Sequence, residues 1–270
     1  MPANTIFLLV EGPHDAEFMA RLLKLRGFKQ RTTLSAIPAH FQKLFPSDFP
    51  ATEDTPLTER HPVPGFYQNA GQWLVMLIGG GSKAAMTLGM ALKRSRIAGF
   101  VPDAVGVMVD QDQDARPEAA RDRFTAEFSK EEDLPVSLDF TIQPGTVTEA
   151  TPRCGLFVLP DNHHTGALED LLLECGEENY KALKDKALTF RDDTLTNAQL
   201  TADDLKEYGE PGGPKHISKQ KKAWVSAMGA ILVPAAAIQN SIRKNRWLEG
   251  AALNLPRVQA VQKFLDDLIA

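Results

Sequence analysis

Residues 5–15 read TIFLLVEGPHD, and the prediction of the fold starts from them. Its first six residues form a short, continuous apolar run, which is typical of a strand buried on both faces of a parallel sheet. The turn EGPHD follows, and the next residues carry apolar side chains at helical spacing up to Gly27, a residue typical of helix C-termini. The stretch therefore predicts a strand, a turn and a helix.

The same unit recurs along the chain. Residues 73–78 (WLVMLI) and 104–109 (AVGVMV) predict two more buried strands, each followed by a helical segment. Residues 154–159 predict another strand, and residues 137–143, which alternate in polarity, predict one more. Strands that alternate with helices predict an α/β domain with a parallel sheet flanked by helices and joined by right-handed crossovers.

Two regions depart from this repeat. Residues 29–72 contain several prolines and polar clusters, and they predict an irregular insertion with one short helix near residues 40–44. After about residue 178 the pattern becomes helical and polar. We therefore expect an α/β domain over residues 1–178 and a mainly helical C-terminal extension over residues 179–270 that packs on it.

The composition is that of an ordinary globular protein: 43% of the 270 residues are hydrophobic and 24% are charged. Apolar runs fall short of the ~20 residues of a membrane helix, and no signal peptide is visible, so we expect a cytoplasmic protein away from membranes. Cys154 and Cys175 are too few for a disulfide framework or a zinc cluster. The net charge of −5 argues against nucleic-acid binding over the whole surface but leaves room for a local basic groove.

Three carboxylates follow the third predicted strand. Asp110, Asp112 and Asp114 repel one another unless water or a cation offsets their charge. Directly after a buried strand, a bound cation is the better explanation, and hard oxygen ligands select Mg²⁺, Mn²⁺ or Ca²⁺ over zinc. A calcium-binding EF-hand is excluded, because its sixth and twelfth positions would be Ala115 and Arg121 instead of Gly and Glu.

Other carboxylates come from neighbouring strand ends. Glu11 follows the first predicted strand, Asp15 opens the next helix, and Glu169 lies in the first turn of the helix after the last strand. Asp15 and Glu169 could instead serve as helix N-terminal carboxylates, and that alternative stays open. Because sites of open parallel sheets lie outside the carboxyl ends of the strands, we expect these side chains and Asp110 and Asp112 to converge on a divalent-metal site.

Two further segments could hold phosphate groups. Residues 79–83 (GGGSK) follow the second predicted strand and could offer backbone N–H groups to an anion, although a plain tight turn is the alternative. Lysines after the Gly/Pro loop of the C-terminal region could contact phosphates or form a solvated helix face. The phosphate-binding candidates are Gly80, Gly81, Ser82, Lys83, Lys215, Lys219 and Lys222.

These segments together resemble the TOPRIM domain, shared by topoisomerases, DnaG-type primases and OLD-type nucleases. Residues 7–15 match its first signature, an apolar strand followed by V-E-G-x-x-D and a helix. Residues 107–112 match its second, a strand that ends in D-x-D, and the turn at residues 79–81 is similar to its middle strand–helix junction. The resemblance spans roughly residues 5–130, and residues 154–175 look like a smaller bacterial group of TOPRIM-like proteins.

The resemblance implies a Rossmann-like sheet in which Glu11 is a general acid or base and Asp110 and Asp112 hold Mg²⁺. Asp15 and Glu169 would hold a second ion, as in two-metal nucleases, and Asp114 is a weaker candidate ligand. The gate domain of a topoisomerase and the zinc-binding region of a primase are missing from the sequence. The ATPase domain of OLD-type nucleases is missing too, but a separate partner chain could supply it. By elimination, the resemblance implies a Mg²⁺- or Mn²⁺-dependent nuclease with one or two ions.

Two other functions stay open. The chain could be a non-catalytic module that binds a nucleotide or nucleic acid through the same metal site, acting in phage defence with a partner. It could also be a small-molecule phosphatase, because Asp110-Gln111-Asp112 fits the D-x-D spacing of haloacid-dehalogenase-type phosphatases. That fold normally places its nucleophilic aspartate on the first strand, which ends here in Glu11-Gly12.

Overall fold

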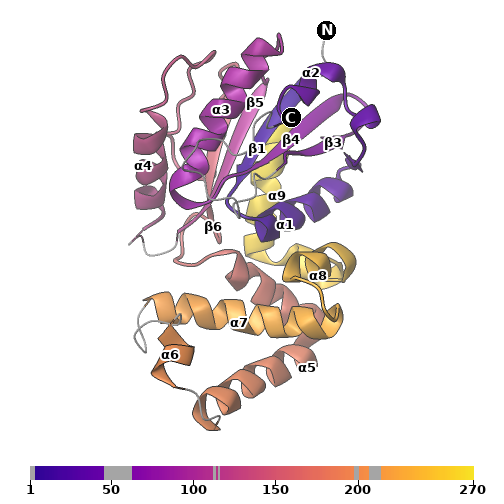
Figure 1. Cartoon of the computed structure of the whole chain (residues 1–270), viewed down its shortest axis with the longest axis vertical. Helices are drawn as coiled ribbons and strands as arrows, with labels where there is room; N and C mark the ends of the chain where they lie inside the picture. Colours follow the sequence, from indigo (N-terminus) through magenta and orange to yellow (C-terminus); the bar gives the residue numbers. More distant parts are fainter. Residues whose placement is uncertain (1–3, 46–62, 112–113, 115, 198–200, 207–213) are drawn as a thin grey trace.

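The computed structural model of the chain describes residues 4–45, 63–111, 114, 116–197, 201–206 and 214–270. A sheet covered by helices forms the upper part of the molecule in Figure 1, and a smaller group of helices lies below it. The last helix returns from that group to the sheet, so the two parts are joined by more than one crossing of the chain.

A six-stranded, mostly parallel sheet forms the centre of the molecule, in the order β2-β3-β4-β1-β5-β6. Its four parallel strands are β1 (Asn4–Val10), β4 (Gln72–Ile78), β5 (Ala104–Asp110) and β6 (Arg153–Leu159). Strand β1 lies between β4 and β5 and is parallel to both, and β5 is parallel to β6. The α/β class and these four predicted strands are therefore confirmed.

The other two strands were not expected. Strands β2 (Lys29–Arg31) and β3 (Gly65–Gln68) lie near the two ends of the predicted irregular insertion. They pair with each other and β3 pairs with β4, in both cases antiparallel, so the sheet is mixed. The prediction of an irregular segment was wrong at these ends, because strands this short carry too little periodicity to be recognised. Residues 46–62 lie outside the described part of the chain.

The predicted strand at residues 137–143 is also wrong, since the structure shows an irregular segment there. Its alternating pattern has a different cause. Phe140 is buried and lies edge-on to the rings of Phe124 and Phe128, while Leu138 packs at the border of the same apolar cluster. A chain that sends every second side chain into a core gives the same pattern with or without a neighbouring strand.

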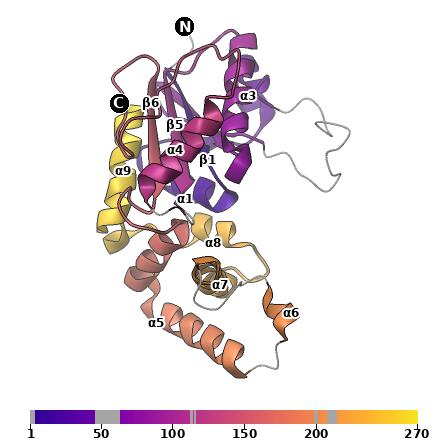
Figure 2. The same cartoon turned by 90° about the vertical axis from the view of Figure 1, so that its left-hand side faces the viewer.

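Helices cover both faces of the sheet, as Figure 2 shows. The longer ones are α1 (Pro13–Leu25), α3 (Ala84–Ile97), α4 (Pro117–Phe128), α5 (Leu168–Asn197), α7 (Pro214–Leu232), α8 (Ile238–Lys244) and α9 (Pro256–Ile269). The shorter ones are η1 (Leu34–Ala36), α2 (Ala39–Gln42), η2 (Gly81–Lys83), α6 (Ala202–Leu205) and η4 (Gly250–Asn254). Among the described residues, each helix is too short or too polar to span a membrane.

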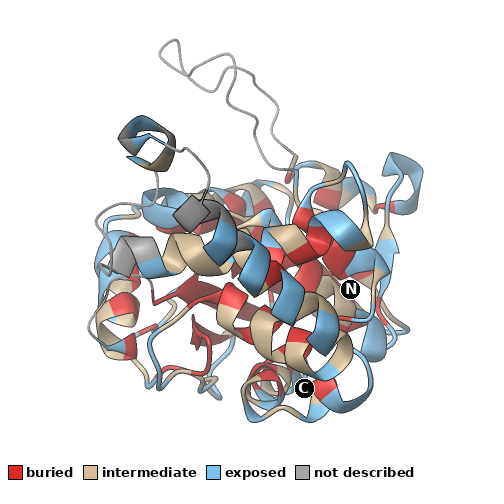
Figure 3. Ribbon diagram, turned by 90° about the horizontal axis from the view of Figure 1, so that it is seen from below, coloured by how far each residue is buried: buried red, intermediate tan, exposed pale blue. Residues whose placement is uncertain are grey.

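Strand β1 shows why the apolar runs are continuous. Ile6, Leu8 and Val10 face one apolar cluster, which includes residues of α1 and α9. Phe7 and Leu9 face a second cluster on the other side of the sheet, formed with α3 and α4. All five side chains are essentially inaccessible to solvent, and Figure 3 shows buried residues in red along the sheet. A strand covered on both faces needs apolar residues at every position.

The C-terminal helices divide between two places. Helices α5, α7 and α8 pack together beside the sheet, and α8 also contacts α1. Helix α9 lies instead against β5 and β6, where Leu268 fills the space next to Gly106. Helix α5 crosses the boundary that we expected after residue 178, and its backbone departs from helical geometry at Tyr180.

Candidate functional site

The segments around Glu11 and Asp110 end side by side. Strands β1 and β5 are parallel neighbours, so Glu11 and Asp110 lie at the same edge of the sheet. The backbone N–H of Asp110 donates a hydrogen bond to Oε1 of Glu11, with an N–O distance of 3.2 Å. Oδ1 of Asp110 in turn accepts a hydrogen bond from the backbone N–H of Leu168 at 3.3 Å, which brings the start of α5 to this edge.

Asp15 is the most perturbed carboxyl group at this edge. It is buried near the start of α1, and its Oδ2 accepts a hydrogen bond from the backbone N–H of Gly12 at 2.8 Å. Burial raises the pKa of Asp15 to about 7, and the charges of Glu11 and Glu169 also raise it. The structure therefore brings Glu11, Asp15, Asp110 and Glu169 into one cluster, which we call the acidic edge.

The acidic edge offers donors that suit a divalent cation. Carboxylate oxygens are the ligands that Mg²⁺ and Mn²⁺ prefer, and a cation would stabilise the ionised form of Asp15, whose pKa is raised by burial and by neighbouring charges. Among the described residues, no three His, Cys, Asp or Glu side chains already stand at metal-ligand spacing. Asp112, a central member of the predicted set, lies outside the described residues.

Gln111 adds a candidate oxygen ligand that the sequence alone did not indicate. Its side chain is fully buried, and its Nε2 donates a hydrogen bond to the backbone oxygen of Asp114 at 2.8 Å. Its Oε1 is also buried and has no hydrogen-bond partner among the described residues. Leaving a buried acceptor unpaired costs about 1–3 kcal/mol, so a water or a cation is expected there. A divalent ion at the acidic edge stays a prediction, with carboxylate and amide oxygens as the ligand types on offer.

Asp114 lies close to an arginine of α4. Its Oδ2 is 3.2 Å from Nη1 of Arg123, although the angles do not make a hydrogen bond. The charge of Asp114 is therefore already offset in part by Arg123. Its role as a weaker metal ligand stays a prediction.

The glycine turn at residues 79–81 lies directly against Glu11. The backbone N–H of Gly79 donates to the carbonyl oxygen of Val10 at 3.0 Å. A Cβ atom on Gly80 would come within 2.8 Å of the carbonyl oxygen of Glu11, so only glycine fits at this position. Gly81 has a φ of +55° and opens η2, which leaves Ser82 and Lys83 exposed before α3. The turn lies at the acidic edge, and its role in phosphate binding stays a prediction.

Helix α7 reaches the same region. Nζ of Lys221 lies 2.6 Å from Oδ1 of Asp170 in the first turn of α5. Burial lowers the pKa of His14, and the charge of Lys222 lowers it further, which places Lys222 near the turn between Glu11 and Asp15. Lys219 lies half-buried on the same helix. The side chain of Lys215 is outside the described part of the chain.

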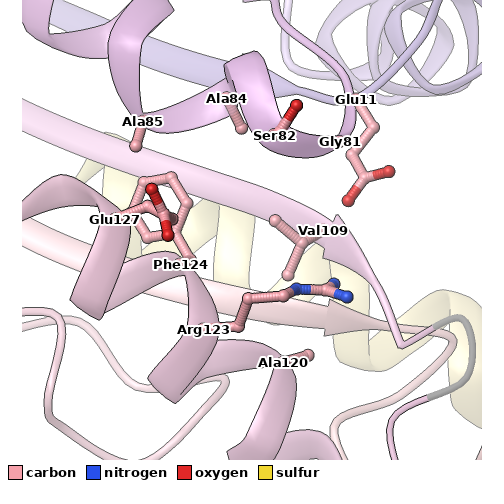
Figure 4. Close-up of a pocket in the computed structure, with 10 residues that line it drawn as sticks. All are labelled: Glu11, Gly81, Ser82, Ala84, Ala85, Val109, Ala120, Arg123, Phe124 and Glu127. Atoms are coloured by element: carbon pink, nitrogen blue, oxygen red, sulfur yellow. The ribbon is translucent and has the colours of Figure 1, made fainter.

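A cavity of about 200 Å³ opens beside Glu11 (Figure 4). It lies between α3 and α4, and Arg123, Phe124 and Glu127 contribute to its lining from α4. The sequence predicted only a helical segment after residues 104–109 and no functional role for these three residues. Arg123 and Glu127 do stand four residues apart, so they share one helix face, but that spacing alone is also typical of a solvated surface.

Comparison with known proteins gives three findings. Residues 5–269 match the family described as "Protein of unknown function (DUF3226)". A crystal structure of a hypothetical protein from Pyrococcus horikoshii OT3 is similar over 98% of this chain and 95% of its own, with a TM-score of 0.47 and 16% sequence identity. No curated protein matches the chain.

Proposed function

We propose that this chain, which belongs to the DUF3226 family, is a Mg²⁺- or Mn²⁺-dependent nuclease with a TOPRIM-like acidic site. The observation that carries the proposal is the acidic edge itself. Glu11 and Asp110 follow neighbouring parallel strands and are linked through the backbone of Asp110. Asp15 is buried beside them, and its pKa is raised by burial first and then by the charges of Glu11 and Glu169. Carboxylates crowded at a strand edge are what phosphoryl-transfer chemistry with divalent ions requires.

Within this proposal the carboxylates divide into two roles. Asp15, Asp110 and Glu169 would hold one or two cations, with Oε1 of Gln111 as a further oxygen donor. Glu11 would move a proton to or from the reacting oxygen, because it is less buried than the other three carboxylates and lines the cavity. A divalent cation, when bound, would stabilise the negative charge that develops on the phosphate.

The chain also supplies groups suited to a phosphodiester backbone. The turn at residues 80–82 would offer backbone N–H groups beside Glu11. Lys219 and Lys222 of α7 would add positive charge, since Lys222 lies near His14 in the turn after β1. Nucleic acid is therefore the substrate that we propose. We place the enzyme in the cytoplasm and propose an ATPase from a separate chain as its partner.

The test uses the purified full chain with Mg²⁺ or Mn²⁺ and single- and double-stranded DNA and RNA. Glu11→Gln and Asp110→Asn are expected to abolish cleavage while the thermal unfolding midpoint shows that the fold persists. Glu132→Gln, an exposed carboxylate in the loop after α4, serves as the control and should keep full activity. Absence of metal-dependent cleavage on every substrate would overturn the proposal.

A non-catalytic module that binds a nucleotide or nucleic acid through the same carboxylates is the second candidate, because the acidic edge alone does not distinguish binding from cleavage. In that case calorimetry would detect metal-dependent binding of nucleotides without turnover. A phosphatase that uses Asp110 as nucleophile is less well supported. Asp110 is largely buried and its Oδ1 already accepts a hydrogen bond from Leu168. A trapped phospho-aspartate at Asp110 would favour the phosphatase over the nuclease.

A further inference from the structure

Small residues line the cavity beside Glu11 from both helices that border it. Ala84 and Ala85 come from the start of α3 and Ala120 from α4, and all three are buried. Larger side chains at these positions would close the space between the two helices. The alanines therefore leave an apolar slot that opens at the acidic edge (Figure 4).

The ring of Phe124 forms one wall of the slot, and its position is fixed from behind. The ring of Phe128 stacks on it at a centroid distance of 5.9 Å and an angle of 11°. Phe140 meets it edge-on at 5.3 Å and 85°. An aromatic wall held in this way presents a rigid apolar surface, which suits a flat ligand group.

Polar side chains stand at both ends of the slot. In Figure 4 the guanidinium group of Arg123 and the carboxylate of Glu11 lie toward the end of β5, while the carboxylate of Glu127 lies beside the ring of Phe124. Glu127 also pairs with Lys130 through Oε1 at 2.6 Å, but both side chains are exposed, so the pair is weak. Its other oxygen remains able to accept a hydrogen bond from a ligand.

A ligand that matches this slot has an apolar ring, a hydrogen-bond donor on the ring edge and a negative group at the acidic edge. We infer that the slot binds a nucleobase, belonging to the nucleotide next to the phosphate held at the acidic edge. The inference rests on the proposed function and names the substrate group that the site selects. Glu127 accepts hydrogen bonds at the end of the slot away from the acidic edge, where cytosine and adenine would place an exocyclic amino group and uracil a carbonyl oxygen that a carboxylate repels. Cytosine and adenine therefore bind better than uracil.

Calorimetry with the full chain and Mg²⁺ tests this directly, using CMP, AMP and UMP as probes. Ribose 5-phosphate carries the phosphate without a base and serves as the reference. We expect AMP and CMP to bind at least about fivefold more tightly than ribose 5-phosphate, the low end of the effect of a base–aromatic contact. CMP should bind about fivefold more tightly than UMP, as expected for one hydrogen bond.

Variants separate the two parts of the slot. Ala84→Leu fills it and is expected to reduce AMP binding to the level of ribose 5-phosphate, whereas Ala119→Leu, on the half-buried neighbouring position of α4, should not. Glu127→Gln changes only an exposed side chain at one end of the slot. It therefore still tests base binding if the Ala84→Leu protein fails to fold. It should remove the preference for CMP over UMP. Lys130→Gln breaks the same ion pair but keeps the Glu127 acceptor, and it should retain that preference.

The outcomes distinguish this inference from the proposed function. Base-dependent binding that Ala84→Leu removes, without cleavage of any nucleic acid, would support the slot and overturn the nuclease. Metal-dependent cleavage together with equal binding of AMP and ribose 5-phosphate would support the nuclease and overturn the slot. Failure of every nucleotide to bind would also overturn the slot.

Discussion

Asp15→Asn gives the sharpest test of the acidic edge, because it removes one charge and keeps the local hydrogen bond. The amide oxygen of asparagine can still accept from the backbone N–H of Gly12. If Asp15 were only a helix N-terminal carboxylate, its substitution would destabilise α1 by about 0.3–1 kcal/mol. If burial and the charges of Glu11 and Glu169 dominate, substitution should stabilise the metal-free protein.

The magnitude follows from the pKa of Asp15, which rises from 3.8 to about 7 on folding. Between these two values the folded state holds more protons than the unfolded state, so this carboxyl group makes the protein less stable as pH rises through the window. The full shift corresponds to about 4 kcal/mol above pH 7. The free energy of unfolding of the Asp15→Asn protein should therefore be higher than that of the parent protein by less than about 1 kcal/mol at pH 4 and by up to about 4 kcal/mol at pH 8.

The assay is urea unfolding with EDTA at pH 4 and pH 8, followed by the same titration with Mg²⁺. Added Mg²⁺ should stabilise the parent more at pH 8 than at pH 4 and should stabilise the Asp15→Asn protein much less. Glu118→Gln, in the first turn of α4, is the matched control for a helix N-terminal carboxylate and should slightly destabilise the protein at pH 8. If Asp15→Asn behaves like Glu118→Gln at pH 8, the reasoning about crowded carboxylates is refuted.

Gly80→Ala should lower the free energy of unfolding in urea by about 1–3 kcal/mol, because its Cβ would press on the carbonyl oxygen of Glu11. Nuclease activity should fall as well. Gly71→Ala is the control, since its Cβ meets nothing within 4 Å among the described residues, and unchanged activity in both variants would contradict the close approach. Leu268→Ala should cost about 2–5 kcal/mol in the same assay, because this side chain is fully buried against β5. Ile269→Ala, at a half-buried neighbouring position, should lower the free energy of unfolding clearly less than Leu268→Ala does. Equal effects would contradict close packing of α9 against the sheet.

The core of the fold could be predicted because its signals are local. The apolar run before Glu11 and the run before Asp110 each specify a strand buried on both faces, and both strands lie where they were expected. Parallel pairing then brings the carboxyl ends of the two strands together. The proximity of Glu11 and Asp110 was therefore predictable from two short segments and from a general property of parallel sheets.

The missed features depend on distant contacts. Strand β2 is three residues long, and it is recognisable only through its pairing with β3. The slot requires Ala84 of α3 and Phe124 of α4 to face each other, which depends on how the two helices pack. Gln111 is buried beside Asp110 by the same tertiary packing. Such contacts leave no periodic trace in the sequence.

Helix α9 is synthesised last, although it covers strands that are made much earlier. Strands β5 and β6 leave the ribosome well before residues 256–269, yet α9 covers one of their faces. Until then, the apolar side chains that contact Phe264 and Leu268 stay open to water or to other chains. The sheet that carries the acidic edge can therefore close only after α9 has been made, and a ribosome stalled before residue 256 would hold an aggregation-prone chain without a finished site.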